Sequence, residues 1–101
     1  MTTEVTVRDA PDSSRLEAVL PDGRVAGFAH YEPGRSTYVF DHTVVDDEFE
    51  GQGIGGQLAD GVVAYARERG VSVDPTCSFL RAHLARHPED QDVLADGVDL
   101  G

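Results

Sequence analysis

The sequence predicts a single α/β domain of the α+β type, with a mixed sheet and elements in the order β-β-β-β-α-β-α. The chain has 101 residues, a usual length for one domain. Four β-prone runs separated by turn residues fill its first half. The second half has a long amphipathic helical repeat and then a short apolar run. Because a strand, a helix and a strand normally form a right-handed parallel crossover, the last strand should lie parallel to the fourth. We treat residues 1–101 as one domain.

The first half should form four antiparallel strands joined by tight turns. Each run either alternates polar and apolar residues or is dense in β-branched and aromatic ones. Proline and glycine stand in the intervening turns, where turn geometry favours them. The predicted strands are Glu4–Arg8, Arg15–Leu20, Arg24–Tyr31 and Ser36–Val45.

The second half should begin with a helix from Ile54 to Arg69. Its apolar residues recur at steps of three and four, and Gly70 suits the position after its last turn. Val71–Val73 is the expected fifth strand.

A second helix is predicted over Asp74–Arg86. Asp74 would cap this helix and Pro75 would occupy its first position, where the missing N–H is harmless. Residues 89–95 can add a further helical turn or two, and residues 96–101 should form a frayed tail.

The charge of the chain excludes one class of function. Nineteen acidic residues against eight basic ones give a net charge of −11, and every basic residue is Arg. A chain this acidic repels nucleic-acid backbones, so DNA or RNA binding is not expected. Since molar salt shortens the screening length to about 3 Å, we interpret the charge as adaptation to a salt-rich, halophilic cytoplasm. An ordinary acidic protein from a GC-rich genome would also favour Arg over Lys.

The expected location is the cytoplasm. No apolar run approaches the ~20 residues of a membrane span, so no membrane partner is expected. The N-terminus lacks the basic and apolar regions of a signal peptide. The single cysteine, Cys77, excludes an internal disulfide and a Cys-rich metal site. We expect a monomer or a weak dimer.

The segment Gly51–Gly56 contains four glycines in six positions, between the fourth strand and the first helix. Glycine lets the backbone approach a ligand closely, and a helix N-terminus offers unpaired N–H groups to a phosphate or pyrophosphate. A P-loop would need Lys and then Ser or Thr where Gln57 stands. A dinucleotide fingerprint would follow the first strand of a parallel unit, not four antiparallel strands. A mobile turn that binds nothing remains an alternative.

These features resemble a known family. The strand, the loop Glu50-Gly-Gln-Gly-Ile-Gly55 and the helix are similar to the acetyl-CoA-binding motif of the GNAT superfamily of N-acetyltransferases. The resemblance covers residues 14–95. It extends more narrowly to the short, single-domain Yjdj-type branch. The residues that support this narrower resemblance are His42-Thr43, the glycine loop, Pro75-Thr-Cys77, Phe79 and His87-Pro-Glu89.

The resemblance implies a binding mode for acetyl-CoA, the acetyl donor. The fourth and fifth strands would splay apart to admit the pantetheine arm, and the backbone of the fourth strand would pair with that arm. Amides of the glycine loop would hold the pyrophosphate, and the thioester would lie near Cys77. The implied coenzyme-binding residues are Thr43, Val44, Val45, Gly51, Gln52, Gly53, Ile54, Gly55 and Gly56.

Two residues are candidates for catalysis, Cys77 and His42. At the start of a helix, the dipole should lower the thiol pKa of Cys77, which can then protonate the leaving thiolate or accept the acetyl group. His42, on the strand beside the acyl site, can act as a general base. Each residue also has a structural alternative, Cys77 as a small buried apolar group and His42 as a hydrogen-bonded strand residue.

No metal is expected from the sequence. His83 and His87 are four residues apart on one helical face, a spacing that can bind a metal, but no third ligand is evident. The leading functional hypothesis is therefore N-acetyl transfer from acetyl-CoA to an amine acceptor. Glu50, which stands where the superfamily usually has Arg or Gln, favours the alternative of a non-catalytic acyl-CoA-binding module. A third possibility is a structural protein whose glycine loop binds nothing.

Overall fold

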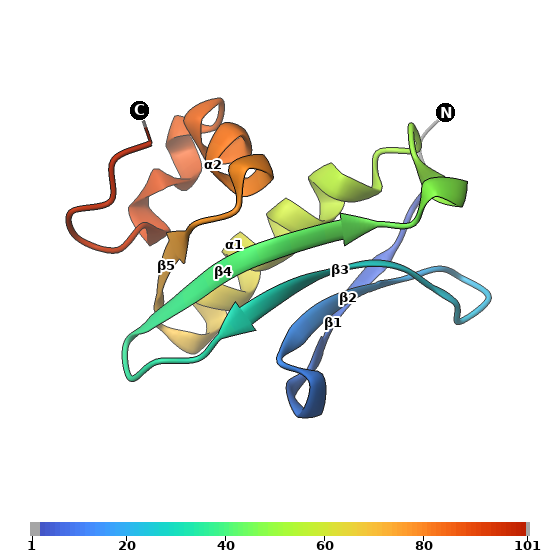
Figure 1. Cartoon of the computed structure of the whole chain (residues 1–101), viewed down its shortest axis with the longest axis horizontal. Coiled ribbons are helices and arrows are strands. Elements are labelled where there is room, and N and C mark those ends of the chain that lie inside the picture. Colours follow the sequence, from blue (N-terminus) through green and yellow to red (C-terminus); the bar gives the residue numbers. More distant parts are fainter. Residues whose placement is uncertain (1–2, 101) are drawn as a thin grey trace.

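The computed structural model describes residues 3–100, which form one five-stranded sheet and two α-helices (Figure 1). The order of strands and helices confirms the predicted β-β-β-β-α-β-α, with short 3-10 helices between some elements. The strands are β1 (Thr6–Ala10), β2 (Arg15–Val19), β3 (Val25–Glu32), β4 (Thr37–Val45) and β5 (Ser72–Pro75). The helices are α1 (Ile54–Arg69), α2 (Ser78–Ala85), η1 (Pro11–Ser13), η2 (Asp47–Phe49) and η3 (Pro88–Val93).

The sheet is mixed, as predicted. Its strands lie in the order β1-β2-β3-β4-β5, and the pairs from β1 to β4 are antiparallel. β5 pairs with β4 in parallel, after the crossover through α1. Gly70 ends α1 in the left-handed conformation at φ 68°, and its N–H bonds back to the carbonyls of Ala66 and Arg67. The predicted C-terminal cap is therefore confirmed.

α1 lies across one face of the sheet (Figure 1). Val62 of α1 packs there in one cluster with Leu80 and Leu84 of α2, and Leu58 of α1 packs in a second cluster. Each of these four residues is at most 1% exposed. The other face is polar, with Glu17 held between Arg8 and Arg15 at 3.3 and 2.8 Å. Among residues 3–100, no helix is both long and apolar enough to cross a bilayer.

The first strand runs from Thr6 to Ala10, not from Glu4 to Arg8 as predicted. The residues before it contact the glycine loop instead. The N–H of Thr3 bonds the carbonyl of Gln52 at 2.8 Å, and the N–H of Val5 bonds Gln57 Oε1 at 2.9 Å. The alternation of residues 4–8 carries no information on these long-range contacts, so the sequence placed the start of the first strand too early.

The second helix starts four residues later in the structure than predicted, at Ser78 and not at Asp74. Asp74 and Pro75 belong to β5, where they pair with Val39 and Phe40 of β4, and the helix itself is Ser78–Ala85 with Cys77 as its N-cap. A proline is tolerated here because β5 is an edge strand that ends at this residue. Local capping signals favoured the helix, but strand pairing prevailed.

The tail makes contacts that a frayed segment would lack. The N–H of Val98 bonds the Ala95 carbonyl at 3.2 Å, and Leu100 packs against the main apolar cluster. Arg81 donates to the Asp99 carbonyl. We therefore correct the expectation for residues 96–100, while Gly101 lies outside the described residues. The 3-10 helix η3 agrees with the extra helical turn predicted over residues 89–95.

Candidate functional site

β4 and β5 separate about halfway along β4. They pair from Thr37 with Ser72 as far as Phe40 with Pro75. Beyond this point the N–H groups of Thr76 and Cys77 bond the Phe40 carbonyl at 3.0 and 3.3 Å, and the chain turns into α2. Within the described part of the chain, the edge of β4 from residue 41 to 45 has no strand partner on this side. This opening corresponds to the predicted splay.

The glycine loop presents backbone amides at the start of α1. Gly51 and Gly53 have φ angles of 79° and 78°, in the left-handed region that favours glycine. Gly53 is the N-cap of α1, and no side chain from residues 3–100 caps the helix there. The Gln57 N–H bonds the Gly53 carbonyl at 3.3 Å. The three preceding amides have no carbonyl one turn earlier in the helix, so they can serve a phosphate.

The segment Thr3–Val5 holds this loop in place. Besides its backbone bond to Gln52, Thr3 bonds the Gln52 side chain through its hydroxyl and the Gln57 amide through its carbonyl. Gln57 also accepts from Val5. The sequence analysis missed this contribution of Thr3 and Gln57, because no local pattern connects residues about fifty positions apart.

Cys77 and Thr43 meet where the two strands separate. The thiol of Cys77 lies 3.5 Å from Thr43 Oγ1 and donates to it. Burial alone would raise the pKa of this thiol, but the backbone N–H groups of Leu80 and Phe79 and the Thr43 hydroxyl stabilise the thiolate. The net effect is a lowered pKa for Cys77, in the direction that the helix N-terminus predicts.

The side chain of Phe79, in the first turn of α2, contacts the glycine loop. A Cβ atom built on Gly55 would come within 2.9 Å of Phe79 Cζ, so the ring rests directly against the first turn of α1. The Phe79 side chain is nevertheless 38% exposed, an unusual state for a large apolar residue. It can therefore move away from the loop at a small cost in buried area.

His42 lies on the other face of β4 from Cys77. Its ring packs edge-on against Phe28, with ring centroids 6.3 Å apart. Its neighbour Thr43 contacts Cys77, and successive strand residues face opposite sides of a sheet. The structure thus brings Cys77 and Thr43 together but does not bring His42 to either. A role for His42 stays a prediction.

The remaining predicted residues divide between the two faces. Val44 lines a hollow of about 280 Å³ on the polar face, together with Arg15, Phe28 and Asp46. Val45 and Ile54 pack in the core beneath α1, and Ile54 is only 1% exposed. Two other hollows, of about 410 and 260 Å³, lie beside the C-terminal tail and between α1 and β1. None of these three connects Cys77 to the glycine loop.

Comparisons with known proteins agree with this geometry. A family model described as GCN5-related N-acetyl-transferase matches residues 15–93, a range that includes the glycine loop, Thr43 and Cys77. No curated protein matches the chain. The solution structure of a GCN5-like protein from Staphylococcus aureus is similar, with a TM-score of 0.69 and 26% sequence identity. The alignment covers 95% of this chain and 92% of that one, so the two share the whole fold.

Proposed function

Because this chain belongs to the GCN5-related N-acetyltransferase family, we propose that it transfers the acetyl group of acetyl-CoA to an amine. The observation that carries the proposal is the meeting of Cys77 and Thr43 where β4 and β5 separate. The open edge of β4 begins at this point. The glycine loop, with its unpaired amides, follows β4 and begins α1.

The donor site has features that fit a coenzyme A thioester. A diphosphate can accept hydrogen bonds from amides at a helix N-terminus, and the left-handed glycines leave these amides accessible. An extended pantetheine arm can pair with an unpartnered strand edge as an added strand does. We assign this arm to Thr43, Val44 and Val45, and the diphosphate to the loop from Gly51 to Gly56.

Acetyl transfer to an amine requires a deprotonated amine and a proton for the leaving thiolate. The amine nitrogen attacks the carbonyl carbon, the carbon–sulfur bond breaks, and the thiolate leaves. Cys77 can supply the proton that this thiolate takes up, and the amine gives up its own proton in forming the amide. His42 can accept that proton through water if the acceptor approaches from the polar face of the sheet.

Several finer assignments rest on the same proposal. The acceptor is an amine on a small molecule or on a protein, and the net charge of −11 favours a cationic one. Location in a salt-rich cytoplasm and membership of the Yjdj-type branch are parts of the proposal.

Binding should be tested first, by calorimetry with acetyl-CoA in molar KCl. Gly51→Ala should weaken binding about tenfold or more, because the loop must then leave the left-handed conformation. Gly23→Ala is the matched control, since Gly23 is also left-handed at φ 92° with open space around it. Equal affinities for acetyl-CoA in the two variants would count against the glycine loop as the donor site.

Turnover should be tested next, by thiol release from acetyl-CoA with a panel of amines. Cys77→Ala should lower the rate about tenfold or more if Cys77 transfers a proton or the acetyl group. Unchanged turnover would leave Cys77 with a packing role only. If acetyl-CoA binds but no amine releases the thiol, the chain is a non-catalytic acyl-CoA-binding module.

A further inference from the structure

A buried histidine nitrogen lacks a hydrogen-bond partner at the junction of α1, α2 and η3. His83 is 6% exposed, and its Nε2 bonds to no group among the described residues. Asp60 Oδ1 lies 3.4 Å away, on the facing side of α1, in a contact that fails the geometry of a hydrogen bond. A buried polar atom without a partner is costly, so its retention requires an explanation.

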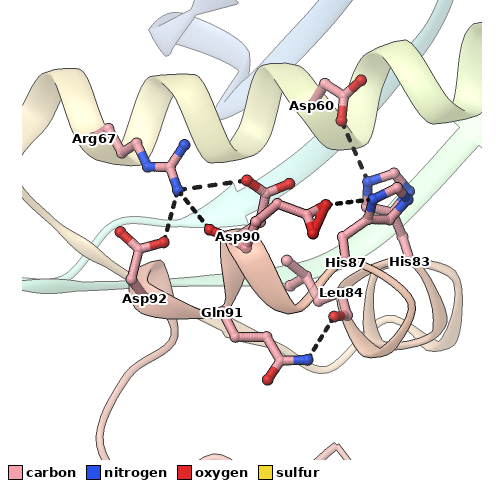
Figure 2. Close-up of polar contacts among 9 residues, drawn as sticks. Asp60, Arg67, His83, Leu84, His87, Asp90, Gln91 and Asp92 are labelled. Carbon is pink, nitrogen blue, oxygen red and sulfur yellow. Dashed lines mark hydrogen bonds and ion pairs between the residues drawn. The ribbon is translucent and has the colours of Figure 1, made fainter.

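His83 lies beside two other side chains that can bind a metal, His87 and Asp90 (Figure 2). His83, His87 and Asp90 each offer a ligand atom, and these atoms lie within 4.8 Å of one another. The two imidazoles stack with centroids 4.2 Å apart. Asp90 comes from the first turn of η3, where its N–H bonds the His87 carbonyl at 2.9 Å, so this turn supplies the third ligand that the sequence analysis lacked.

The surroundings favour a divalent cation. Asp60, Glu89, Asp90 and Asp92 are all acidic, and Arg67 is the cation that reaches Asp90 and Asp92, at 3.4 and 2.6 Å. His87 Nδ1 lies 2.9 Å from Glu89 Oε1. A carboxylate in this position selects the tautomer that leaves Nε2 unprotonated, and it orients a histidine ligand at a zinc site.

We propose that this junction binds one zinc ion through His83, His87 and Asp90, with Asp60 as the fourth ligand. Nitrogen and carboxylate ligands in a tetrahedral set suit Zn²⁺, at about 2.0–2.2 Å from each. Adjacent ligands of such a set lie roughly 3.3 Å apart, close to the 3.4 Å between His83 Nε2 and Asp60 Oδ1. Among His83, His87 and Asp90 the contacts must shorten by about 1.5 Å at most, which the partly exposed side chain of His87 permits. Asp60 lies outside this group of three, and its exposed side chain must turn toward the ion.

The ion would act as a structural link between three elements. It would join α1 to α2 and η3, at the opposite end of α2 from Cys77. The second histidine–carboxylate group found in residues 3–100, His30 with Glu32 and Asp41, lacks the same signature. There His30 is only half-buried, its Nδ1 bonds Asp41 at 2.7 Å, and neither of its ring nitrogens is a buried atom without a partner.

The test is a titration of the tag-free, metal-stripped protein with zinc chloride, and with cobalt chloride as a spectroscopic probe. We expect saturation at one ion per chain and cobalt absorption typical of tetrahedral coordination. Zinc at about 100 times its Kd should raise Tm by roughly 10 °C. His87→Gln and Asp90→Asn should each weaken zinc binding about tenfold or more, while His30→Gln should leave it unchanged.

Each other outcome would overturn the proposal. Failure to saturate, or wild-type zinc affinity in the His87→Gln and Asp90→Asn variants, would exclude this junction as the site. Loss of binding in His30→Gln would place the site on the polar face of the sheet. His83→Gln is the most direct variant, but this residue is buried. Because the His87 side chain is 41% exposed, His87→Gln should fold, and it decides the test if His83→Gln does not fold.

Discussion

The two ends of α2 differ in how their polar groups are satisfied. At the amino end, Cys77 caps the helix without a side-chain cap hydrogen bond from the described residues, and Phe79 is 38% exposed. At the carboxyl end, His83 is buried and its unpartnered nitrogen faces carboxylates. An unpaired polar group near solvent costs little free energy, because water can bond it until a ligand binds. A buried polar group without a partner is unfavourable at all times. The difference fits the substrate site proposed at one end and the zinc ion proposed at the other.

The largest expected contrast is in stability. Leu84, near the carboxyl end, is 1% exposed, so Leu84→Ala should destabilise the fold by about 2–5 kcal/mol. Phe79→Ala, at the amino end, should cost only about 1 kcal/mol, because its ring is already partly in solvent. Urea unfolding of both variants measures the difference. Similar losses would mean that the amino end is as firmly packed as the carboxyl end.

A smaller contrast concerns two adjacent glycines in the first turn of α1. Gly56→Ala should stabilise the protein by about 0.5–1 kcal/mol, since alanine favours a helix and nothing lies within 4 Å of the new Cβ. Gly55→Ala should lose this gain, because its Cβ would meet Phe79 Cζ at 2.9 Å. Urea unfolding provides the measurement. In a Phe79→Ala background the two substitutions should become equivalent, and a persistent difference would exclude the Phe79 contact as its cause.

The thiol of Cys77 gives a pH-dependent test of the amino end. Its pKa should lie below that of an ordinary cysteine, so its alkylation by iodoacetamide should increase at a lower pH than for a free thiol. The lowered pKa also stabilises the fold above the pKa of the unfolded thiol, and this contribution is lost as pH falls through the folded pKa.

Thr43→Val should move the alkylation profile of Cys77 to higher pH, because the hydroxyl that stabilises the thiolate is removed. Thr43→Ser retains the hydroxyl and is the control. A profile that does not change in Thr43→Val would show that the helix amides alone set the pKa of the thiol.

The smallest expected effect comes from salt. Because the net charge is −11 and acidic side chains gather at the carboxyl end of α2, molar KCl should raise Tm by a few degrees. Melting curves from low salt to molar KCl measure it. Asp60→Asn should reduce the dependence slightly, since it removes one exposed carboxylate from an acidic surface. A Tm that is independent of KCl would remove the interpretation as salt adaptation.

Most of the fold followed from local patterns. The turn residues and alternation of the first half predicted β2, β3 and β4 to within about two residues, and helical periodicity with Gly70 predicted α1. The second helix was predicted less well, because Asp74 and Pro75 are good helix starters locally but pair with β4 in the fold. Strand pairing across a long sequence separation decided that boundary.

The sequence alone determined that Gly51–Gly56 would begin a helix with free amides and that Cys77 would stand at the start of another, since both depend on neighbouring residues. Only the tertiary structure decided that Thr43 meets Cys77 while His42 faces away. It also decided that Asp60 of α1 lies 3.4 Å from the buried Nε2 of His83. These contacts depend on how separate elements pack, and packing geometry is not encoded in any one stretch of the chain.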